Sequence, residues 1–221
     1  MRTRLAVLVA CVVIGLLTAW YAGSRFAPPE PGPTPGTVRL GPESGEQVAA
    51  YLARLPTTLP PPGTAAYALV QFRAELTGAD ALAVATGAAP ETVVFRVPRD
   101  RVQTALRFEP IGSADPRSVE LARERARLAA VADAGRLTGR AGDVAAAEAA
   151  ALADPACPCV VAMVVRGDRA ALDSLAAGPQ VRAVHAAPAD ARPVELALSP
   201  LLPAQREAAT PVPDDGPLPP A

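Results

Sequence analysis

CVVAMVV, residues 159–165, is the most apolar run of the chain after its N-terminal segment. A short continuous run of this kind is typical of a strand that is covered on both faces. The segment DRAALDSLAAG at 168–178 follows, and Leu172 and Leu175 in it are spaced for the inner side of a helix. VRAVH at 181–185 is the next predicted strand. These residues predict a β-α-β unit with a central first strand.

A similar unit precedes it. AYALVQF at 66–72 is rich in β-favouring residues and predicts a strand covered on both faces. Thr77 and Asp80 provide a helix start for residues 78–86. ETVVFRV at 91–97 predicts the second strand, so the chain contains two β-α-β units in tandem.

The segment between the units predicts a hairpin and a helical insertion. VQTALRF at 102–108 alternates, with Arg107 on the side opposite the apolar residues, and is expected to pair with the preceding strand. Asp115 as N-cap and a proline after it predict a long helix to about residue 134. TGRAG at 138–142 breaks that helix, and an alanine-rich helix completes the insertion 115–153. Spacing predicts two ion pairs on the wet side of the long helix, Glu120–Arg123 and Glu124–Arg127.

Two shorter elements flank the units. Ser44 and Gln47 form a capping-box pattern that predicts a helix over about 45–55. Alternation at 194–198 predicts a short edge strand. The expected fold class is therefore α+β, with an N-terminal transmembrane helix followed by a ferredoxin-like antiparallel sheet of two β-α-β units with a helical insertion. The expected divisions are an anchor at 1–26, a Pro/Gly-rich spacer at 27–43, the α+β domain at 44–202 with its insertion 115–153, and a disordered Pro-rich tail at 203–221.

The transmembrane prediction depends on LAVLVACVVIGLLTAWYA, residues 5–22. Eighteen helical residues span roughly 27 Å, close to the thickness of a bilayer core. Arg2 and Arg4 before the run, with aromatic residues at its far end, predict a single pass with the N-terminus in the cytoplasm and the C-terminal domain extracytoplasmic, at the cell membrane. A cleaved signal peptide, or a lipoprotein acylated at Cys11, are the alternatives.

Composition excludes one class of partner. The formal net charge is −1 and aromatic residues make up 4% of the chain. Because there is neither a basic excess nor a set of stacking aromatic residues, we expect no nucleic-acid binding. All basic side chains other than the single histidine are arginines, a bias that suggests a GC-rich bacterial genome.

Cys157-Pro158-Cys159 is the strongest candidate for chemistry. In an extracytoplasmic setting the two thiols can form a disulfide with each other. Residues i and i+2 of a flat strand lie near the limit of disulfide geometry, so a bridge requires a turn at Pro158. Two free thiols, or a redox or metal role, stay open as alternatives, although two sulfur atoms alone do not complete a zinc site.

His185 is the only histidine and is expected to be structural. No catalytic triad, HExxH motif, P-loop or GxGxxG motif accompanies it. The carboxylates at turns and strand ends, Glu75, Asp80, Glu91 and Glu109, are expected to be solvated. We therefore predict no catalytic residue, no cofactor and no metal, and interpret the chain as not an enzyme.

Residues 168–185 resemble part of a known family. LAAGPQVRAV, residues 175–184, is similar to the closing helix and strand of the subtilisin-propeptide (inhibitor I9) family, in which a leucine, a proline and two spaced valines recur. That resemblance implies a peptidase inhibitor of the propeptide type. The chain as a whole is similar to uncharacterised membrane-anchored extracytoplasmic proteins of GC-rich bacteria, and that likeness implies no activity.

The function expected from the sequence is that of a single-pass, membrane-anchored extracytoplasmic binding or scaffolding protein. Its expected partner is another protein of the bacterial envelope, bound through the sheet edge or the helical insertion. A propeptide-like peptidase inhibitor is the first alternative, and an envelope hydrolase is the second.

Overall fold

The structure is a computed structural model that describes residues 12–18, 21 and 34–218. The chain divides into two compact units, Met1–Thr34 and Pro35–Ala221, and the described elements from β1 onward all belong to the second. Of the first unit, residues 12–18 are helical, with the Thr18 hydroxyl donating to the Ile14 carbonyl at 2.7 Å.

The predicted membrane anchor is contradicted. Among the described residues no helix has the length and apolar character that a membrane crossing requires. The described helix inside the predicted run covers residues 12–18, a length of about 10 Å against a bilayer core of about 30 Å. The predictions of a transmembrane helix, a single pass and an extracytoplasmic localisation are therefore wrong for this part of the chain. The rest of the predicted run, and the spacer up to residue 33, lie outside the described residues.

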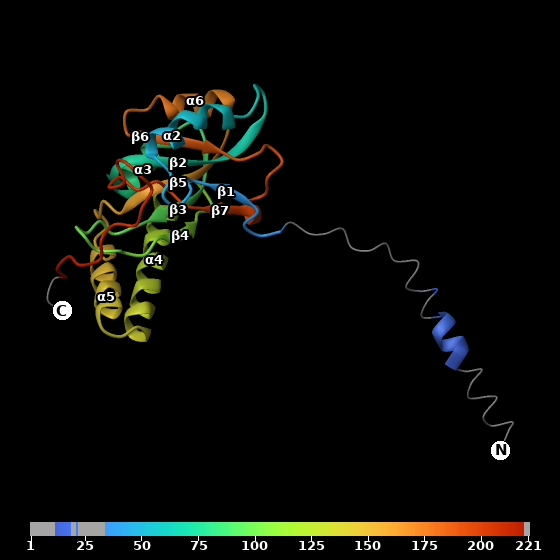
Figure 1. The fold of residues 1–221 in the computed structure, drawn as a ribbon, viewed down its shortest axis with the longest axis horizontal. Coiled ribbons are helices and arrows are strands. Elements are labelled where there is room, and N and C mark those ends of the chain that lie inside the picture. Colours follow the sequence, from blue (N-terminus) through green and yellow to red (C-terminus); the bar gives the residue numbers. More distant parts are fainter. Residues whose placement is uncertain (1–11, 19–20, 22–33, 219–221) are drawn as a thin grey trace, which may run out of the picture. The chain divides into compact units, whose positions relative to one another are not determined.

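The domain is built on a five-stranded antiparallel sheet (Figure 1). Its strands are β2 (Ala65–Leu76), β3 (Ala89–Phe95), β4 (Arg107–Pro110), β5 (Val160–Asp168) and β6 (Val181–Ala186), in the order β4-β3-β5-β2-β6. β5 contains the apolar run from which the sequence analysis started, and it lies at the centre of the sheet as predicted. Its apolar residues are buried on both faces.

The two predicted β-α-β units are confirmed. α3 (Gly78–Val84) connects β2 to β3, and α6 (Arg169–Ala176) connects β5 to β6. The Thr77 side chain accepts a hydrogen bond from the Asp80 N–H, and Asp168 caps α6 in the same way. Because β5 lies between β2 and β3, the units interleave in a split β-α-β arrangement. The predicted fold class is wrong in its first element, and the structure supports a mixed α/β domain with no transmembrane helix among the described residues.

The helical insertion is a hairpin of α4 (Pro116–Arg136) and α5 (Arg140–Leu152), close to the predicted bounds. Asp115 caps α4 by accepting from the Ser118 N–H, and a proline stands at the first helical position. The two helices run side by side, and their far end extends beyond the sheet (Figure 1).

The strand predicted at 102–108 is shorter and lies later, at β4, although it pairs antiparallel with β3 as expected. The sequence placed Arg107 on the wet side. In the structure Arg107 is buried and Phe108 is 40% exposed. The reason is that the insertion covers the side of β4 to which Arg107 belongs, while the opposite side of this edge strand lacks a cover over Phe108.

The four helices α3, α4, α5 and α6 cover one face of the sheet. The core on that face combines strand residues such as Phe72 and Met163 with small helical residues, among them Ala122 and Ala126. Alanine allows the helices to approach the sheet closely, but it contributes little buried apolar area.

The opposite face is covered by the two ends of the domain rather than by long helices. β1 (Val38–Leu40) and β7 (Leu196–Leu198) form a separate parallel pair over it. α2 (Val48–Arg54), with the 3₁₀ turn Leu55–Thr58, packs beside them. A second 3₁₀ turn, Pro193–Glu195, precedes β7. The strand predicted at 194–198 thus pairs with β1 and not with the main sheet, and ordered structure begins before the predicted boundary at residue 44.

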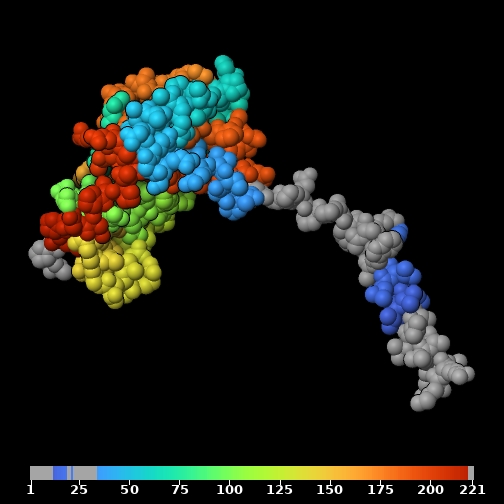
Figure 2. Space-filling model, viewed as in Figure 1, coloured from blue at the N-terminus to red at the C-terminus, as the bar shows by residue number. Residues whose placement is uncertain are grey.

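The segment after Pro203, predicted to be disordered, lies along the domain up to residue 218. Its backbone forms hydrogen bonds with residues 45–48. For example, the Ala209 N–H donates to the Glu46 carbonyl at 2.8 Å. Further along, Asp215 pairs with Arg101. Figure 2 shows this tail, in red, on the surface between the light-blue region around residue 50 and the yellow helical hairpin.

Candidate functional site

The outer side of α4 carries three exposed apolar residues. Leu121, Leu128 and Val131 are 62%, 52% and 46% exposed. Positions seven and three residues apart lie on one side of a helix. The buried residues of α4, which are Val119, Ala122, Ala126 and Ala130, lie on the opposite side. The outer side of the helix thus combines three exposed apolar residues with charged ones such as Arg117 and Arg125, and it has no cover within the described structure. We call Leu121, Leu128 and Val131 the α4 stripe.

Ion pairs lie within and beside the α4 stripe. The two predicted pairs are confirmed, with Glu120–Arg123 at 2.7 Å and Glu124–Arg127 at 2.6 Å. A third pair joins α4 to the sheet, because Arg125 contacts Glu109 of β4 at 2.9 Å. By helical spacing Glu124 lies between Leu121 and Leu128, so one ion pair divides the stripe and the other two lie beside it.

A polar pocket of about 540 Å³ lies between the insertion and the segment before β4. Its floor is the buried pair Arg107–Glu148, which joins β4 to α5. The carboxylate of Glu148 accepts from the Arg107 guanidinium at 2.6 Å and from the Ala105 N–H at 2.6 Å. Asp133 of α4 lies 3.1 Å from the same guanidinium. The pair therefore connects the hairpin to the edge of the sheet.

The mouth of this pocket holds a second set of charges. Arg140 contacts Asp214 of the tail at 3.2 Å. The Gln103 N–H donates to the same carboxylate, and this hydrogen bond, with Arg140, holds the pKa of Asp214 below its usual value. Arg136 and then Arg107 likewise lower the pKa of Asp133. Asp133 and Asp214 are thus ionised and paired at neutral pH.

The pocket has the chemistry of a structural cluster or of a binding site. Its lining residues include no histidine, cysteine or serine. Threonine supplies its one hydroxyl, and that group of Thr104 donates to the Val97 carbonyl at 2.6 Å. The lining of this pocket therefore offers a general base no free hydroxyl or thiol that it could activate as a nucleophile.

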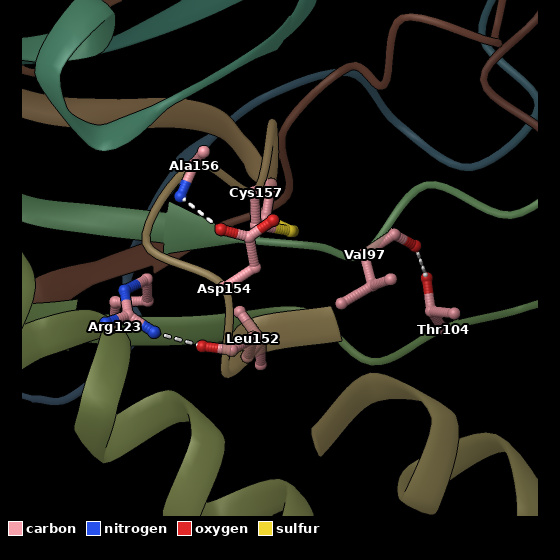
Figure 3. Close-up of a disulfide and its surroundings, with 8 residues drawn as sticks. Val97, Thr104, Arg123, Leu152, Asp154, Ala156 and Cys157 are labelled. Carbon is pink, nitrogen blue, oxygen red and sulfur yellow. Dashed lines mark hydrogen bonds between the residues drawn. A yellow bond between two sulfur atoms is a disulfide. The ribbon is translucent and has the colours of Figure 1, made fainter. Parts of the chain in front are cut away.

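Cys157 and Cys159 lie in the connection from α5 to β5, where the structure joins them in a disulfide (Figure 3). Their Cα atoms are 5.3 Å apart, within the usual range for such a bond. Both residues are buried. The Ala156 N–H donates to the Asp154 carboxylate at 2.8 Å, which forms the turn before the first cysteine.

The surroundings of the cysteines suit a structural role. Cys157 borders a small cavity of about 90 Å³ beside Phe95 and Val119. The Arg123 guanidinium donates to the Leu152 carbonyl near this turn (Figure 3). Within the described residues, no group of three or more histidine, cysteine or acidic side chains is arranged to hold a metal ion.

His185 lies in β6 and is 6% exposed. Its Nδ1 atom accepts from the Gly41 N–H at 2.9 Å and lies 3.3 Å from the Tyr51 hydroxyl. That hydroxyl accepts from the Gln71 amide at 2.8 Å, and the Gln71 oxygen accepts from the Leu201 N–H. This chain of hydrogen bonds joins the sheet to both ends of the domain. It occupies the Nδ1 atom of the histidine.

Burial lowers the pKa of His185 to about 4, and the positive charge of Arg54 acts in the same direction, while Glu46 opposes it. The imidazole is therefore neutral at pH 7, with its proton on Nε2 because Nδ1 is an acceptor. Burial also raises the pKa of Tyr51 to about 12. These values describe a structural network rather than an acid–base pair near neutral pH.

The candidate carboxylates are not brought together. Asp80 belongs to the cap of α3, where it accepts from the Thr77 hydroxyl at 2.7 Å. Glu109 pairs with Arg125. Glu75 borders a different pocket, at the end of β2, and Glu91 lies in β3.

Sequence reasoning missed Glu148 and Arg96, although both positions carry a signal. Glu148 follows Val144 by four residues and precedes Leu152 by four, so it shares the buried side of α5. Arg96 is two residues after Val94 and therefore belongs to a buried face of the sheet. In each case a charged residue occupies a position that the period assigns to the core.

Comparison of the chain with protein-family models, with curated proteins and with solved structures gave no match. The site is therefore interpreted from its own geometry.

Proposed function

We propose that this chain is a protein-binding module without catalytic activity, and that its helical hairpin is the part that contacts the partner. The observation that carries the proposal is the α4 stripe. Large apolar side chains this exposed, grouped on one side of a helix and bordered by charged residues, are typical of a protein interaction site.

The architecture supports this proposal. The far end of the hairpin extends beyond the sheet, so a partner can reach α4 without displacing the core (Figure 1). The buried Arg107–Glu148 pair fixes the hairpin to β4. A rigid presentation of the stripe lowers the entropy that is lost on binding.

The test combines cross-linking with a matched variant. A photo-activatable side chain is placed at Ala132, which is exposed on the stripe side of α4, in the full chain within its own cells. The cross-linked partner is identified by mass spectrometry, purified and titrated directly. Exchange of Leu121, Leu128 and Val131 for glutamate is expected to weaken binding at least tenfold, because it places charges in an apolar contact.

The control is Val194→Glu. Val194 is 50% exposed and lies before β7, away from α4. This variant is expected to bind like the wild type. Equal binding by both variants would contradict the proposal. Cross-linking only to copies of the same chain would also contradict it if the mass of the protein in solution does not change with its concentration.

A further inference from the structure

A second pocket, of about 380 Å³, lies where the loop after β3 meets the tail. Three arginines line it, Arg96, Arg99 and Arg101, together with Glu75 and Asp100. The tail forms the remaining wall through Ala204, Val212 and Pro213. This pocket is separate from the one above Glu148 and from the α4 stripe.

Arg96 is the unusual residue of this pocket. Its side chain is buried, with the residue 5% exposed, and its guanidinium donates to the Val102 carbonyl at 3.2 Å. None of the ion pairs between described residues includes Arg96. A buried charge without a counter-ion is costly. Burial accordingly lowers the pKa of Arg96, and Glu75 and Glu148 offset this only through longer-range attraction.

Arg99 contributes a buried donor, its Nε atom, that has no hydrogen-bond partner in the described structure. Arg99 likewise belongs to none of the ion pairs between described residues. Two guanidinium groups outside those ion pairs thus line one cavity, and guanidinium forks match carboxylate and phosphate oxygens.

The loop that carries these arginines is held in position. Arg101 has φ of 53°, a left-handed conformation that is unfavourable for arginine. The tail stabilises it, since Asp215 pairs with the Arg101 side chain and the Gly216 N–H donates to its carbonyl at 2.7 Å. A Cβ atom at Gly216 would meet the Asp100 carbonyl at 2.2 Å, so this approach requires glycine. Preorganisation of this kind is expected at a ligand site.

The surroundings are also positive. The pKa of Arg182 is lowered by burial and then by the nearby charges of Arg73 and Arg206. Arg73 lies two residues before Glu75, and Arg206 lies two residues after Ala204, so both are close in sequence to the pocket wall. Three arginines and two carboxylates line the pocket, and Asp215 of the tail pairs with one of those arginines, Arg101.

We propose that the pocket at Arg96 and Arg99 binds the anionic group of a small ligand, a carboxylate or a phosphate. The Arg96 guanidinium forms the floor and supplies the counter-charge, and Arg99 closes over the anion from the loop. The volume accommodates a small organic acid or phosphate ester.

The experiment measures thermal unfolding of the full chain in sodium phosphate or disodium succinate, each against sodium chloride at equal ionic strength. Isothermal titration then gives the affinity for the same two anions. At least one anion is expected to raise the melting temperature of the wild type, because a ligand that binds only the folded state stabilises it. A response to phosphate, to succinate or to both identifies the group that the pocket accepts.

Arg99→Gln is the first variant, because Arg99 is only partly buried and its replacement leaves the core intact. We expect its anion affinity to fall roughly tenfold to hundredfold, the usual effect of losing a charge-assisted hydrogen bond. Arg96→Met is expected to lose the response and to unfold at the same temperature as the wild type or above it, because it removes an unpaired buried charge. Arg117→Gln, on exposed α4, should keep the full response.

The proposal is overturned if neither anion raises the melting temperature above the chloride reference. It is equally overturned if Arg99→Gln responds like the wild type. A lower melting temperature of Arg96→Met without any change in anion affinity would assign that arginine a purely structural role. None of these outcomes depends on the α4 stripe, so the two proposals fail independently.

Discussion

The two faces of the sheet are covered in different ways. On one face four helices pack against the strands, and the polar groups there are concentrated in the Arg107–Glu148 pair. On the other face the two ends of the domain lie over the strands, and a chain of hydrogen bonds from Gly41 to Leu201 passes through His185, Tyr51 and Gln71.

This difference shows that regular elements and chain ends hold to a sheet by different means. Helices bring a repeated row of apolar side chains, so each residue contributes a small and similar amount. A segment without repeating backbone bonds has to satisfy its N–H and C=O groups individually. Buried side chains such as Gln71 and His185 provide those bonds, and each one is specific to its place.

The largest effect is expected on the helical face. Glu148→Ala leaves the buried Arg107 with Asp133 alone and removes the acceptor of the Ala105 N–H. Breaking a buried pair in this way costs about 3 to 5 kcal/mol. Chemical denaturation measures it, with Glu120→Ala in the exposed pair of α4 as the control, where a change below about 1 kcal/mol is expected. Similar losses for both variants would remove the distinction between buried and exposed pairs.

The second effect concerns the opposite face. Ending the chain after Pro203 removes the backbone bonds that Glu207 and Ala209 form with residues 45–48. It also removes the contacts of Asp215 and Asp214 with the loop after β3, and that of Asp214 with α5. At about 0.5 to 1.5 kcal/mol for each bond that replaces a bond to water, we expect a loss of about 2 to 4 kcal/mol in the free energy of unfolding. A truncated chain as stable as the full one would show that the tail merely rests on the surface, as its composition predicts.

These two regions also show how far the sequence could predict the structure. β5, both β-α-β units and the α4 cap at Asp115 follow from periodicity and capping residues, which act over a few neighbouring positions. The contact of β7 with β1 joins residues about 160 apart, and no local pattern encodes it. The apolar run at 5–22 matches the length of a membrane span. Among the described residues of that run, however, the continuous helix covers only 12–18.

The candidate sites were less predictable than the fold. The prediction for Cys157 and Cys159 used their spacing and an expected extracytoplasmic setting, whereas Glu148 and Arg96 are of interest because they are buried. A charged residue at a core position has two interpretations in a sequence, a misplaced pattern or a buried charge. The structure decides between these interpretations, because it shows Arg107 beside Glu148 and places Arg96 in a pocket with Arg99.

The third prediction is a pH dependence of the free energy of unfolding that comes from His185, on the face covered by the two ends of the domain. The pKa of His185 is about 4 in the folded state and about 6.5 in an unfolded chain. Between these values the unfolded state binds more protons, so stability that is present above pH 6.5 is lost as the pH falls toward 4. We expect a loss of about 2 to 3 kcal/mol, because a protonated Nδ1 can no longer accept from the Gly41 N–H.

The measurement compares denaturation curves of the wild type and His185→Gln at several pH values from 7 to 4. Carboxylates titrate in this range in both proteins, so the difference between the two curves isolates the histidine. That difference should be constant above pH 6.5 and change steadily below it. If the difference in the free energy of unfolding stayed constant from pH 7 to 4, the imidazole would not be desolvated. The face covered by the ends of the domain would then open readily to water.

The smallest effect is expected from the cysteine pair, which lies at the junction of the helical hairpin and the sheet. Intact mass after alkylation should show both thiols protected until a reductant is added, and a gain of two labels without reductant would exclude the bridge. Because the loop closed by residues 157 and 159 is so short, cross-linking restricts the unfolded chain very little. We therefore expect Cys157→Ser combined with Cys159→Ser to change the free energy of unfolding by about 1 kcal/mol or less. A loss comparable to that of Glu148→Ala would instead mean that this turn holds the helical hairpin to β5, and that the helical face, like the opposite one, depends on a single specific connection.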